Sequence, residues 1–386
     1  MRAVFRVGLA VLAMAASELW LWQHPDAMAQ QRLAYDKTKV EFSAIEGWDK
    51  EDHRAAFAAF RKSCPKILSR SAGKTGTGSL TDICKIAVML PVKLSAADAK
   101  AFFEQNFDPW LVKRPEKGAM LTGYFEPEVK GSLTPTKHFN VPVYSKPQDL
   151  VMLTRVANRG TLAADLTAGR MAPEGLVPYF TRREIEQGAL TGRGLEIAYL
   201  SDAYEAFVMQ IQGSGLIRLP DGRGLRIGFA GKNGHPYTSV GKVLVERGEM
   251  ETQSASMQSI MSWMRANKQR GRELMWENKS YAFFRLLSTE EAQEGPQGAM
   301  QLSLIAGRSL AVDPRYHQLG TPIWVSSPAA KDIDGKPVAR LMVAHDTGSA
   351  IRGPVRGDLF WGSGDAAGKV AGVTKHICDF FTLLPK

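Results

Sequence analysis

Short strand-like runs flank a partly helical middle, and this interrupted order constrains the fold more than any other feature of the sequence. From Leu121 onward, runs such as LTGYFEPEVKG, FNVPVYS and TPIWVSS alternate with Gly and Pro turns, as barrel strands do. We also assign EAFVMQIQGSGLIRLPDGRGLRIGFAG to strands, with a hairpin turn at Asp221-Gly222. Strands return after Gly295, so the pattern predicts one domain inserted into another.

Helices are predicted where apolar residues recur at helical spacing. One covers residues 49–61, and a second, AADAKAFFEQNF, begins after a Ser95 cap. Thr181 and Glu184 have the spacing of a capping box. A stripe of apolar residues in the middle of the chain predicts core packing rather than a binding surface. Its members are Met257, Ile260, Met261 and Met264.

The amino terminus has the order of an export signal. Arg2 and Arg6 precede an apolar stretch over residues 7–16, and small residues follow at 27–29. We expect a signal peptide over residues 1–29, cut after Ala29, with an uncleaved amphipathic anchor as the alternative. No cysteine lies near this cut, so a lipid anchor is not expected. The prediction is a soluble exported protein.

A formal net charge of +10 and a pI near 9.4 favour an anionic partner. Nucleic acid, membrane headgroups and an acidic polysaccharide all satisfy that condition. The Lys and Arg residues are scattered singly, and no known nucleic-acid-binding signature is present. The sequence therefore argues against nucleic acid as the partner.

Three cysteines are present, and the oxidising compartment expected after export would allow two of them to form a disulfide. Cys64 and Cys84 enclose a short polar loop, so we expect a disulfide between them, with two buried thiols as the alternative. Cys378 stands alone near the end of the sequence. The seven histidines never occur in the paired spacing of a zinc site, and we expect neither metal nor cofactor.

A group of aspartates carries the strongest indication of chemistry. Asp346 follows an apolar run in the signature Asp-Thr-Gly-Ser of aspartic proteases, but only one such loop occurs in 386 residues. Asp358 directly follows Gly357, and Asp313 stands in the segment AVDPRYHQLG. We expect all three aspartates at strand ends, although a single aspartate there often only caps a turn. We expect Phe360 and Trp361 to raise the pKa of Asp358 and to stack against sugar rings.

Four ordered motifs resemble the membrane-bound lytic murein transglycosylase A family. They are TGYFEPEVKGS, MQIQGSG, AGKNGHPYTSVGKVL and the three-aspartate stretch over residues 312–372. The resemblance extends from about Leu121 to the carboxyl terminus. The sequence departs from the family at its amino terminus, where the lipid-bearing cysteine of well-known members is absent.

The resemblance implies a mainly β fold. A double-psi β-barrel would be built from both chain ends, over residues 30–127 and 286–386, with some peripheral helices. A second β-rich domain, over residues 128–285, would be inserted into it, and a glycan groove would separate the two. Double-psi barrels and aspartic proteases share the psi-loop arrangement, which accounts for the protease-like signature at Asp346.

The resemblance also implies a periplasmic lytic exotransglycosylase that cleaves the β-1,4 bond between N-acetylmuramic acid and N-acetylglucosamine and leaves 1,6-anhydromuramoyl ends. Asp358 would act as the single general acid and base, while Asp346 and Asp313 would raise its pKa by like-charge repulsion. The implied partners are peptidoglycan strands and proteins of cell-wall synthesis or division, with the enzyme itself a monomer. The implied groove residues are Thr122, Tyr124, Gln212, Gly213, Lys232 and Asn233.

Two other functions remain open at this stage. One is a non-catalytic glycan-binding module with a barrel like that of expansins. The other is a water-using hydrolase or protease in which Asp346 and Asp358 act as a pair.

Overall fold

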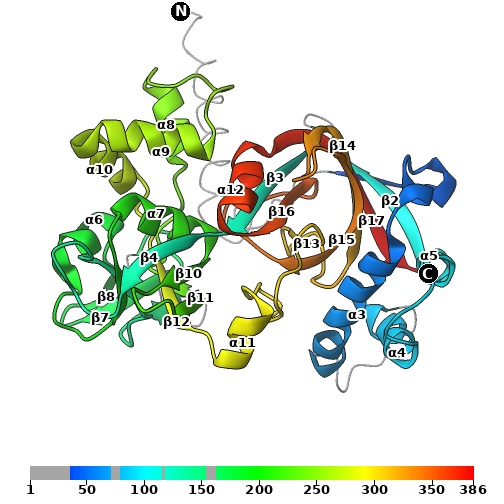
Figure 1. Cartoon of the computed structure of the whole chain (residues 1–386), viewed down its shortest axis with the longest axis horizontal. Coiled ribbons are helices and arrows are strands. Elements are labelled where there is room, and N and C mark those ends of the chain that lie inside the picture. The colour runs from blue at the N-terminus through cyan, green and yellow to red at the C-terminus, as the bar shows by residue number, and fades with distance from the viewer. Residues whose placement is uncertain (1–34, 71–78, 115–117, 154–161) are drawn as a thin grey trace, which may run out of the picture.

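The structure, a computed structural model, describes residues 35–70, 79–114, 118–153 and 162–386. The signal peptide expected over residues 1–29 lies outside these ranges. The chain forms two lobes, a β-barrel on the right of Figure 1 and an inserted, strand-rich lobe on the left. Among the described residues, no helix combines the length and the apolar character needed to cross a membrane.

Six strands close the barrel, in the order β17-β14-β15-β13-β16-β3, and β3 pairs back with β17. β3 precedes the inserted lobe in the sequence and the other five strands follow it, so both ends of the chain build the barrel (Figure 1). The strands are β3 (Ala119–Glu126), β13 (Ser309–Ala311), β14 (Pro322–Lys331), β15 (Pro337–Asp346), β16 (Arg356–Ser363) and β17 (Lys375–Pro385).

Parallel pairs occur within this otherwise antiparallel barrel. β16 runs parallel to β3, and β13 runs parallel to β15. Parallel neighbours require long crossover connections, and here the whole inserted lobe lies between β3 and the later strands. The fold is a double-psi β-barrel with an inserted β-sheet domain, as expected from the sequence. β1 (Asp36–Lys39) and β2 (Phe107–Lys113) extend the barrel sheet from the side of β17.

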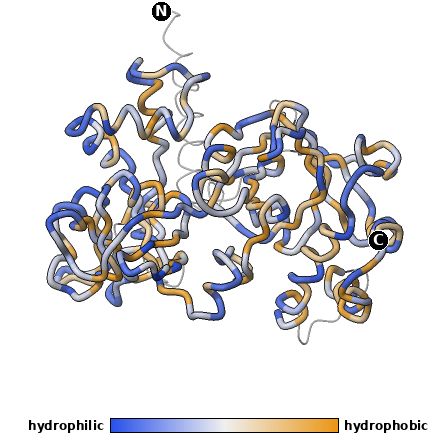
Figure 2. Tube along the Cα trace, in the orientation of Figure 1, coloured by the Kyte–Doolittle hydropathy of each residue, from blue (hydrophilic) through white to orange (hydrophobic). Residues whose placement is uncertain are grey.

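The run Leu341 to Ala344 on β15 is fully buried because both faces of the strand are covered. Met342 and Ala344 face the barrel interior, whereas Leu341 and Val343 pack against helices outside it. Side chains of a strand alternate between faces, so four consecutive apolar residues serve two cores. In Figure 2 apolar stretches likewise run along the barrel strands.

Three helices cover the outer face of the barrel: α3 (His53–Arg70), α4 (Leu80–Met89) and α5 (Ala96–Asn106). Phe57, Phe60, Cys64 and Ile67 lie on one buried face of α3, at the i, i+3, i+7 and i+10 spacing of a helix. This face continues past the expected end at residue 61, so the helix extends to Arg70. Ser95 caps α5 as predicted, by accepting from the Asp98 amide.

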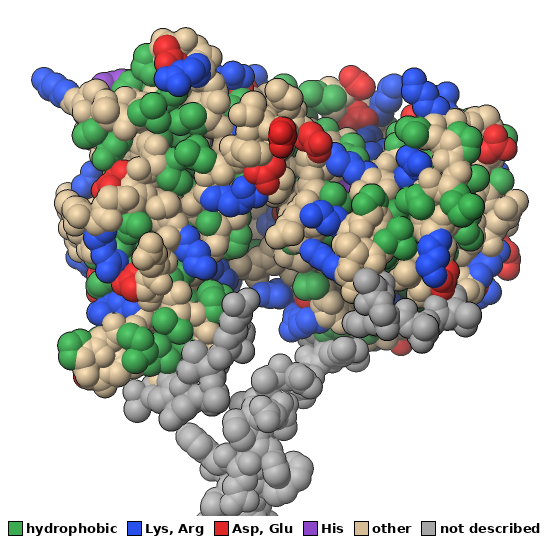
Figure 3. All heavy atoms as spheres, turned by 90° about the horizontal axis from the view of Figure 1, so that it is seen from below, with side chains coloured by type: hydrophobic (Ala, Val, Ile, Leu, Met, Phe, Trp, Pro, Cys, Tyr) green, Lys and Arg blue, Asp and Glu red, His purple; other side chains and the backbone are tan. Residues whose placement is uncertain are grey.

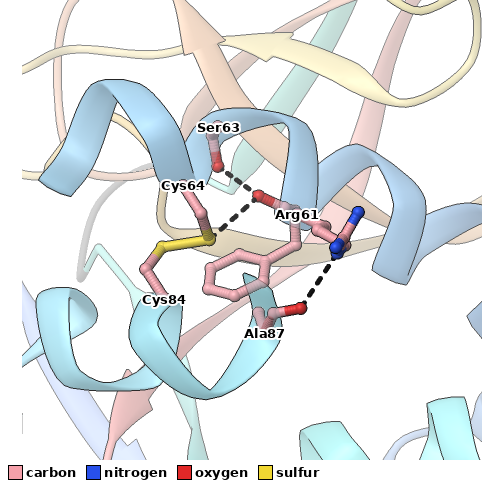
Figure 4. Close-up of a disulfide and its surroundings, with 6 residues drawn as sticks. Arg61, Ser63, Cys64, Cys84 and Ala87 are labelled. Carbon is pink, nitrogen blue, oxygen red and sulfur yellow. Dashed lines mark hydrogen bonds between the residues drawn. A yellow bond between two sulfur atoms is a disulfide. The ribbon is translucent and has the colours of Figure 1, made fainter. Parts of the chain in front are cut away.

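Cys64 and Cys84 form a disulfide that joins α3 to α4, with Cα atoms 5.0 Å apart (Figure 4). Beside it, the Arg61 guanidinium donates to the Ala87 carbonyl at 2.9 Å. The two contacts hold the helices together at both ends of the buried face. Cys378 is free and buried on β17.

The inserted lobe is built on a six-stranded sheet with the order β12-β11-β10-β4-β9-β5. A small sheet, β6-β7-β8, and several helices complete it (Figure 1). Its strands are β4 (Glu128–Ser132), β5 (Val141–Tyr144), β6 (Val151–Met152), β7 (Ala168–Ala172), β8 (Gly175–Pro178), β9 (Glu196–Leu200), β10 (Ser214–Arg218), β11 (Gly224–Lys232) and β12 (Ala282–Leu286). Its helices are α6 (Arg182–Glu184), α7 (Ala203–Gln212), α8 (Val240–Glu246), α9 (Met257–Ala266) and α10 (Lys268–Glu277), and α11 (Thr289–Glu294) leads back to the barrel.

The strand assignment of EAFVMQIQ is wrong, because these residues belong to helix α7. Asp202 caps the helix and Gly213, with a φ of 81°, ends it. Ala206, Phe207 and Met209 are buried, so one face of this helix packs against the core. The rest of that segment forms the predicted hairpin, with β10 and β11 joined across Asp221-Gly222.

The other local predictions for this lobe are confirmed. Thr181 and Glu184 make the capping box of α6. The apolar stripe of α9 packs in a small core with Phe207 and Leu244, where Met264 is buried and Ile260 and Met261 are partly buried.

The disulfide closes a loop with a sequence separation of 20 residues. We predict that the double substitution Cys64→Ala, Cys84→Ala lowers the free energy of unfolding by about 3 kcal/mol, as measured by denaturant titration. The matched control Cys378→Ala should cost about 1 kcal/mol. Thiol labelling of the denatured, unreduced protein should find one reactive cysteine, and three labelled cysteines would contradict the bridge.

Candidate active site

Asp358 is the third residue of β16, where it lies opposite Thr122 of β3 and Ala311 of β13. It was expected at a strand end, but the structure places it inside a strand. Gly357 and Leu359 on either side of it point into the barrel and are buried. Asp358 therefore points to the other, more polar face, where it is partly exposed together with Arg356.

Thr122 connects the two charged residues of this face. Its hydroxyl donates to Asp358 Oδ1 and accepts from Arg356 Nη2 at 2.7 Å. Within the described part of the chain, no hydrogen bond reaches the second carboxylate oxygen, Asp358 Oδ2. That oxygen is available to a ligand.

Burial raises the pKa of Asp358 above its usual value, while the Arg356 charge and the Thr122 hydrogen bond oppose the rise. Desolvation favours the neutral carboxyl, and a nearby cation or donor favours the carboxylate. The expectation that repulsion from Asp313 and Asp346 causes this shift is therefore not supported, because burial is its principal cause.

Asp346, the last residue of β15, is held by three donors. Its Oδ1 accepts from the backbone amides of Ala299 and Thr347, both at 2.8 Å, and its Oδ2 accepts from the Tyr124 hydroxyl at 3.0 Å. Burial nevertheless raises the pKa of Asp346 to about 6, and the charge of Asp358 adds to the rise. The two carboxyls are thus close enough to interact.

Asp313 is fully buried just after β13 and already has a counter-ion. Arg315 Nη2 lies 2.6 Å from its Oδ2, and the Gly353 amide donates to the same oxygen at 2.8 Å. Burial acts to raise the pKa of Asp313, but these partners outweigh it and hold the pKa below its usual value. Asp313 thus secures the loop between β15 and β16.

The expected groove residues of the inserted lobe divide into two kinds. Lys232, the last residue of β11, reaches across to the barrel, where its Nζ donates to Ser349 Oγ at 3.0 Å. Gln212 Oε1 accepts from the Phe125 amide at 3.0 Å, where the two lobes join. Asn233, by contrast, is buried and bonds the backbone of Phe180, Lys279 and Tyr281, so it faces the lobe interior.

Phe360 and Trp361 cannot stack against a sugar ring, contrary to expectation, because both are buried. Trp361 donates to Thr374 Oγ1 at 3.1 Å inside the barrel. Phe360 packs against Tyr124, with ring centroids 5.3 Å apart. These aromatic side chains belong to the barrel interior and form no binding platform.

Two further residues, Tyr237 of the inserted lobe and Glu126 of the barrel, were not predicted from the sequence. Burial raises the pKa of Tyr237, and the charge of Asp358 acts in the same direction. Glu126, fully buried at the end of β3, pairs with Arg226 of β11 at 2.8 Å and accepts from Ser363 Oγ at 2.6 Å. Tyr237 and Glu126 both stand inside the quoted motifs, but their partners are distant in sequence.

A hollow lies between the two lobes in the view from below, and Lys and Arg side chains stand on both sides of it (Figure 3). No group of three or more His, Cys, Asp or Glu residues that could hold a metal occurs in the described ranges. The buried His317 and His345 bond Pro354 and Ser309, and burial lowers the pKa of each to about 4.

Comparison with known families covers most of the chain. Residues 120–285 match the MltA specific insert domain, and residues 308–384 match the 3D domain. The membrane-bound lytic murein transglycosylase A of Vibrio cholerae is 34% identical over 262 residues, which are 67% of this chain and 63% of that protein. The match thus spans somewhat less than two thirds of that relative's length.

Solved structures extend the similarity to the fold. The membrane-bound lytic murein transglycosylase from Agrobacterium tumefaciens is 35% identical with a TM-score of 0.82, over 91% of this chain and 98% of that one. E. coli MltA with bound chitohexaose is 27% identical with a TM-score of 0.63, over 92% and 94% of the two chains. With its insert, its three-aspartate barrel and these relatives, the chain belongs to the membrane-bound lytic murein transglycosylase A family.

Proposed function

We propose that this protein is a lytic transglycosylase of peptidoglycan and that Asp358 is its single general acid and base. The observation that carries the proposal is the difference among the three aspartates. Asp313 is neutralised by Arg315 and Asp346 is bonded through both oxygens, whereas Asp358 keeps Oδ2 free. A partly buried carboxyl with a raised pKa is suited to act as a proton donor.

In the first step, the protonated Asp358 donates to the oxygen that links C1 of N-acetylmuramic acid to C4 of N-acetylglucosamine. The C1–O bond breaks, N-acetylglucosamine leaves as an alcohol, and positive charge develops at C1. Asp358 is then a carboxylate, and the Thr122 hydroxyl with Arg356 behind it stabilises that charge.

In the second step, the carboxylate of Asp358 takes the proton of the muramoyl C6 hydroxyl. The C6 oxygen bonds to C1 and closes the 1,6-anhydro ring, so the acid is restored and no water is consumed. Because donor and acceptor belong to one sugar, the step is intramolecular, and correct placement can contribute roughly 7 kcal/mol or more.

Asp346 and Asp313 position the site in this proposal. Asp346 orients Tyr124 and the backbone at Ala299, and Asp313 fixes Gly353 at the base of the β15–β16 loop. Neither has an oxygen oriented freely toward a ligand. Thr122, Tyr124, Gln212, Gly213 and Lys232 would line the groove, while Asn233 would support it from inside the lobe.

The proposed substrate is a glycan strand in the groove between the lobes. The E. coli relative was solved with chitohexaose, and this chain shares its fold over nearly the whole length. Peptidoglycan lies outside the cytoplasm, where the Cys64–Cys84 disulfide is also stable. We therefore propose that the protein is exported to the periplasm and acts at the cell wall.

We also propose that the inserted domain spans residues 128–285, between barrel segments 30–127 and 286–386. The position of β4, which leaves the barrel at Pro127, supports the first boundary. The second falls within β12, which ends at Leu286.

The first prediction for this mechanism concerns the acid itself. Asp358→Asn should lower the rate of murein solubilisation by at least about 10²-fold, because the amide can neither donate nor accept the catalytic proton. The matched control Asp365→Asn changes an exposed aspartate of the following helix, α12 (Gly364–Val373), and should retain wild-type activity. Near-normal activity of a folded Asp358→Asn variant would show that another residue is the general acid.

A second prediction separates lytic cleavage from hydrolysis. Digestion of murein in ¹⁸O-labelled water should give 1,6-anhydromuramoyl ends without label and no new reducing ends, as measured by mass spectrometry. Labelled reducing ends would indicate a water-using hydrolase, and binding without any product would indicate a glycan-binding module.

A third prediction follows from the raised pKa of Asp346. A carboxyl whose folded-state pKa of about 6 exceeds its usual 3.8 stabilises the fold while protonated and loses that contribution as pH rises through 6. The free energy of unfolding of wild type, relative to Asp346→Asn, should thus fall by up to about 3 kcal/mol between pH 4 and pH 7. Denaturant titrations across this range test it, and a constant difference would show that Asp346 ionises normally.

A further inference from the structure

Two cations, Lys232 and Arg352, belong to opposite lobes and meet at one loop of the barrel, and neither has an acidic partner among the described residues. Lys232 projects from the end of β11 in the inserted lobe, and Arg352 lies on the loop between β15 and β16 of the barrel. Burial lowers the pKa of Lys232, and the positive charge of Arg352 lowers it further. The hydrogen bond from Lys232 Nζ to Ser349 Oγ, at 3.0 Å, places the partly desolvated ammonium group against the loop that carries Arg352.

Neither side chain forms an ion pair within the described part of the chain. By contrast, Arg226 pairs with Glu126 and Arg315 pairs with Asp313. Lys232 donates only to the neutral Ser349 hydroxyl at 3.0 Å, and Arg352 is exposed. Two cations near one loop, neither of them paired with an acid among the described residues, form a site where a bound anion would offset their repulsion.

The loop that carries Arg352 is held in place from both ends. Thr347 donates its amide to Asp346, and Gly353 donates its amide to the buried Asp313. The same loop leads directly into β16, which carries Asp358. The loop that Lys232 contacts therefore connects the strand that ends at Asp346 to the strand that carries Asp358.

We propose that Lys232 and Arg352 form a carboxylate-binding site that recognises the acidic substituents of muramic acid. The inference rests on the proposed function, which it deepens by naming what selects peptidoglycan over a neutral glycan. The N-acetylhexosamine backbone carries no charge, so the ligand must be a substituent. It is the lactyl carboxylate where the stem peptide is absent, or a carboxylate of the stem peptide where it is present.

The residue types suit this ligand. The guanidinium of Arg352 can donate two parallel hydrogen bonds to a carboxylate, and the ammonium of Lys232 adds a point charge from the opposite lobe. The Ser349 hydroxyl that contacts Lys232 is neutral, so it adds no charge to the site.

The test measures binding of three matched hexasaccharides by calorimetry, in an Asp358→Asn background that prevents turnover. The ligands are chitohexaose, a muramic-acid-containing hexasaccharide with free lactyl groups, and the same sugar bearing stem peptides. Lys232→Gln and Arg352→Gln remove one charge each, and Arg352→Lys keeps it. Ser349→Ala keeps both charges, and Lys242→Gln removes the charge of an exposed lysine on α8.

Each charge-removing substitution should weaken binding of at least one acidic hexasaccharide by about tenfold, the effect of losing one charge-assisted hydrogen bond. Chitohexaose binding should change by less than about twofold. The variants Arg352→Lys, Ser349→Ala and Lys242→Gln should bind all three ligands like the Asp358→Asn protein. Loss confined to the free-lactyl sugar assigns the lactyl carboxylate, and loss confined to the peptide-bearing sugar assigns the stem peptide.

Equal weakening of chitohexaose, or no weakening of either acidic ligand, would overturn the proposal. So would a Ser349→Ala variant that loses the acidic ligands as strongly as the charge-removing variants, since the cause would then be the loop contact. Because binding is measured without turnover, failure of the proposed catalytic activity would leave this result independent.

Discussion

The pairing of β3 with β16 on one edge and β17 on the other is the constraint on which the rest of the structure depends. It closes the barrel, and it is made by a strand that ends at Glu126, before the inserted lobe, whereas the next barrel strand begins at Ser309. The parallel register with β16 places Thr122 opposite Asp358. The hydrogen bond that supports the candidate acid is therefore a direct result of barrel closure.

The same strand also orients the inserted lobe. β3 ends at Glu126, whose buried carboxylate is bonded by Arg226 of the inserted sheet and by Ser363 at the end of β16. Loss of either charge would leave the other buried and unpaired, which typically costs about 3–5 kcal/mol. This ion pair joins the end of β3 to the inserted sheet where the chain leaves the barrel, and Lys232 of the same inserted strand as Arg226 reaches the barrel at Ser349.

Three aspartates of one barrel wall have three different environments. Asp313 is neutralised by an arginine two residues away, Asp346 is bonded through both oxygens, and Asp358 combines burial with one free oxygen. Their pKa values move in different directions for that reason, downward for Asp313 and upward for the other two. A single acid can serve both proton transfers when its neighbours hold its position without competing for its proton.

The sequence by itself determined the caps, the 221–222 hairpin, most strands and the motifs that identify the family, because these depend on neighbours within a few residues. The strand predicted for residues 205–212 was wrong, because an apolar run of this length is compatible with either a strand or a helix. Only the tertiary structure decided that Trp361 is buried, that Glu126 meets Arg226 and that Thr122 holds Asp358. Glu126 and Arg226 are 100 positions apart in the sequence, and Thr122 and Asp358 are 236 positions apart. Tertiary packing, not local propensity, brings each pair together.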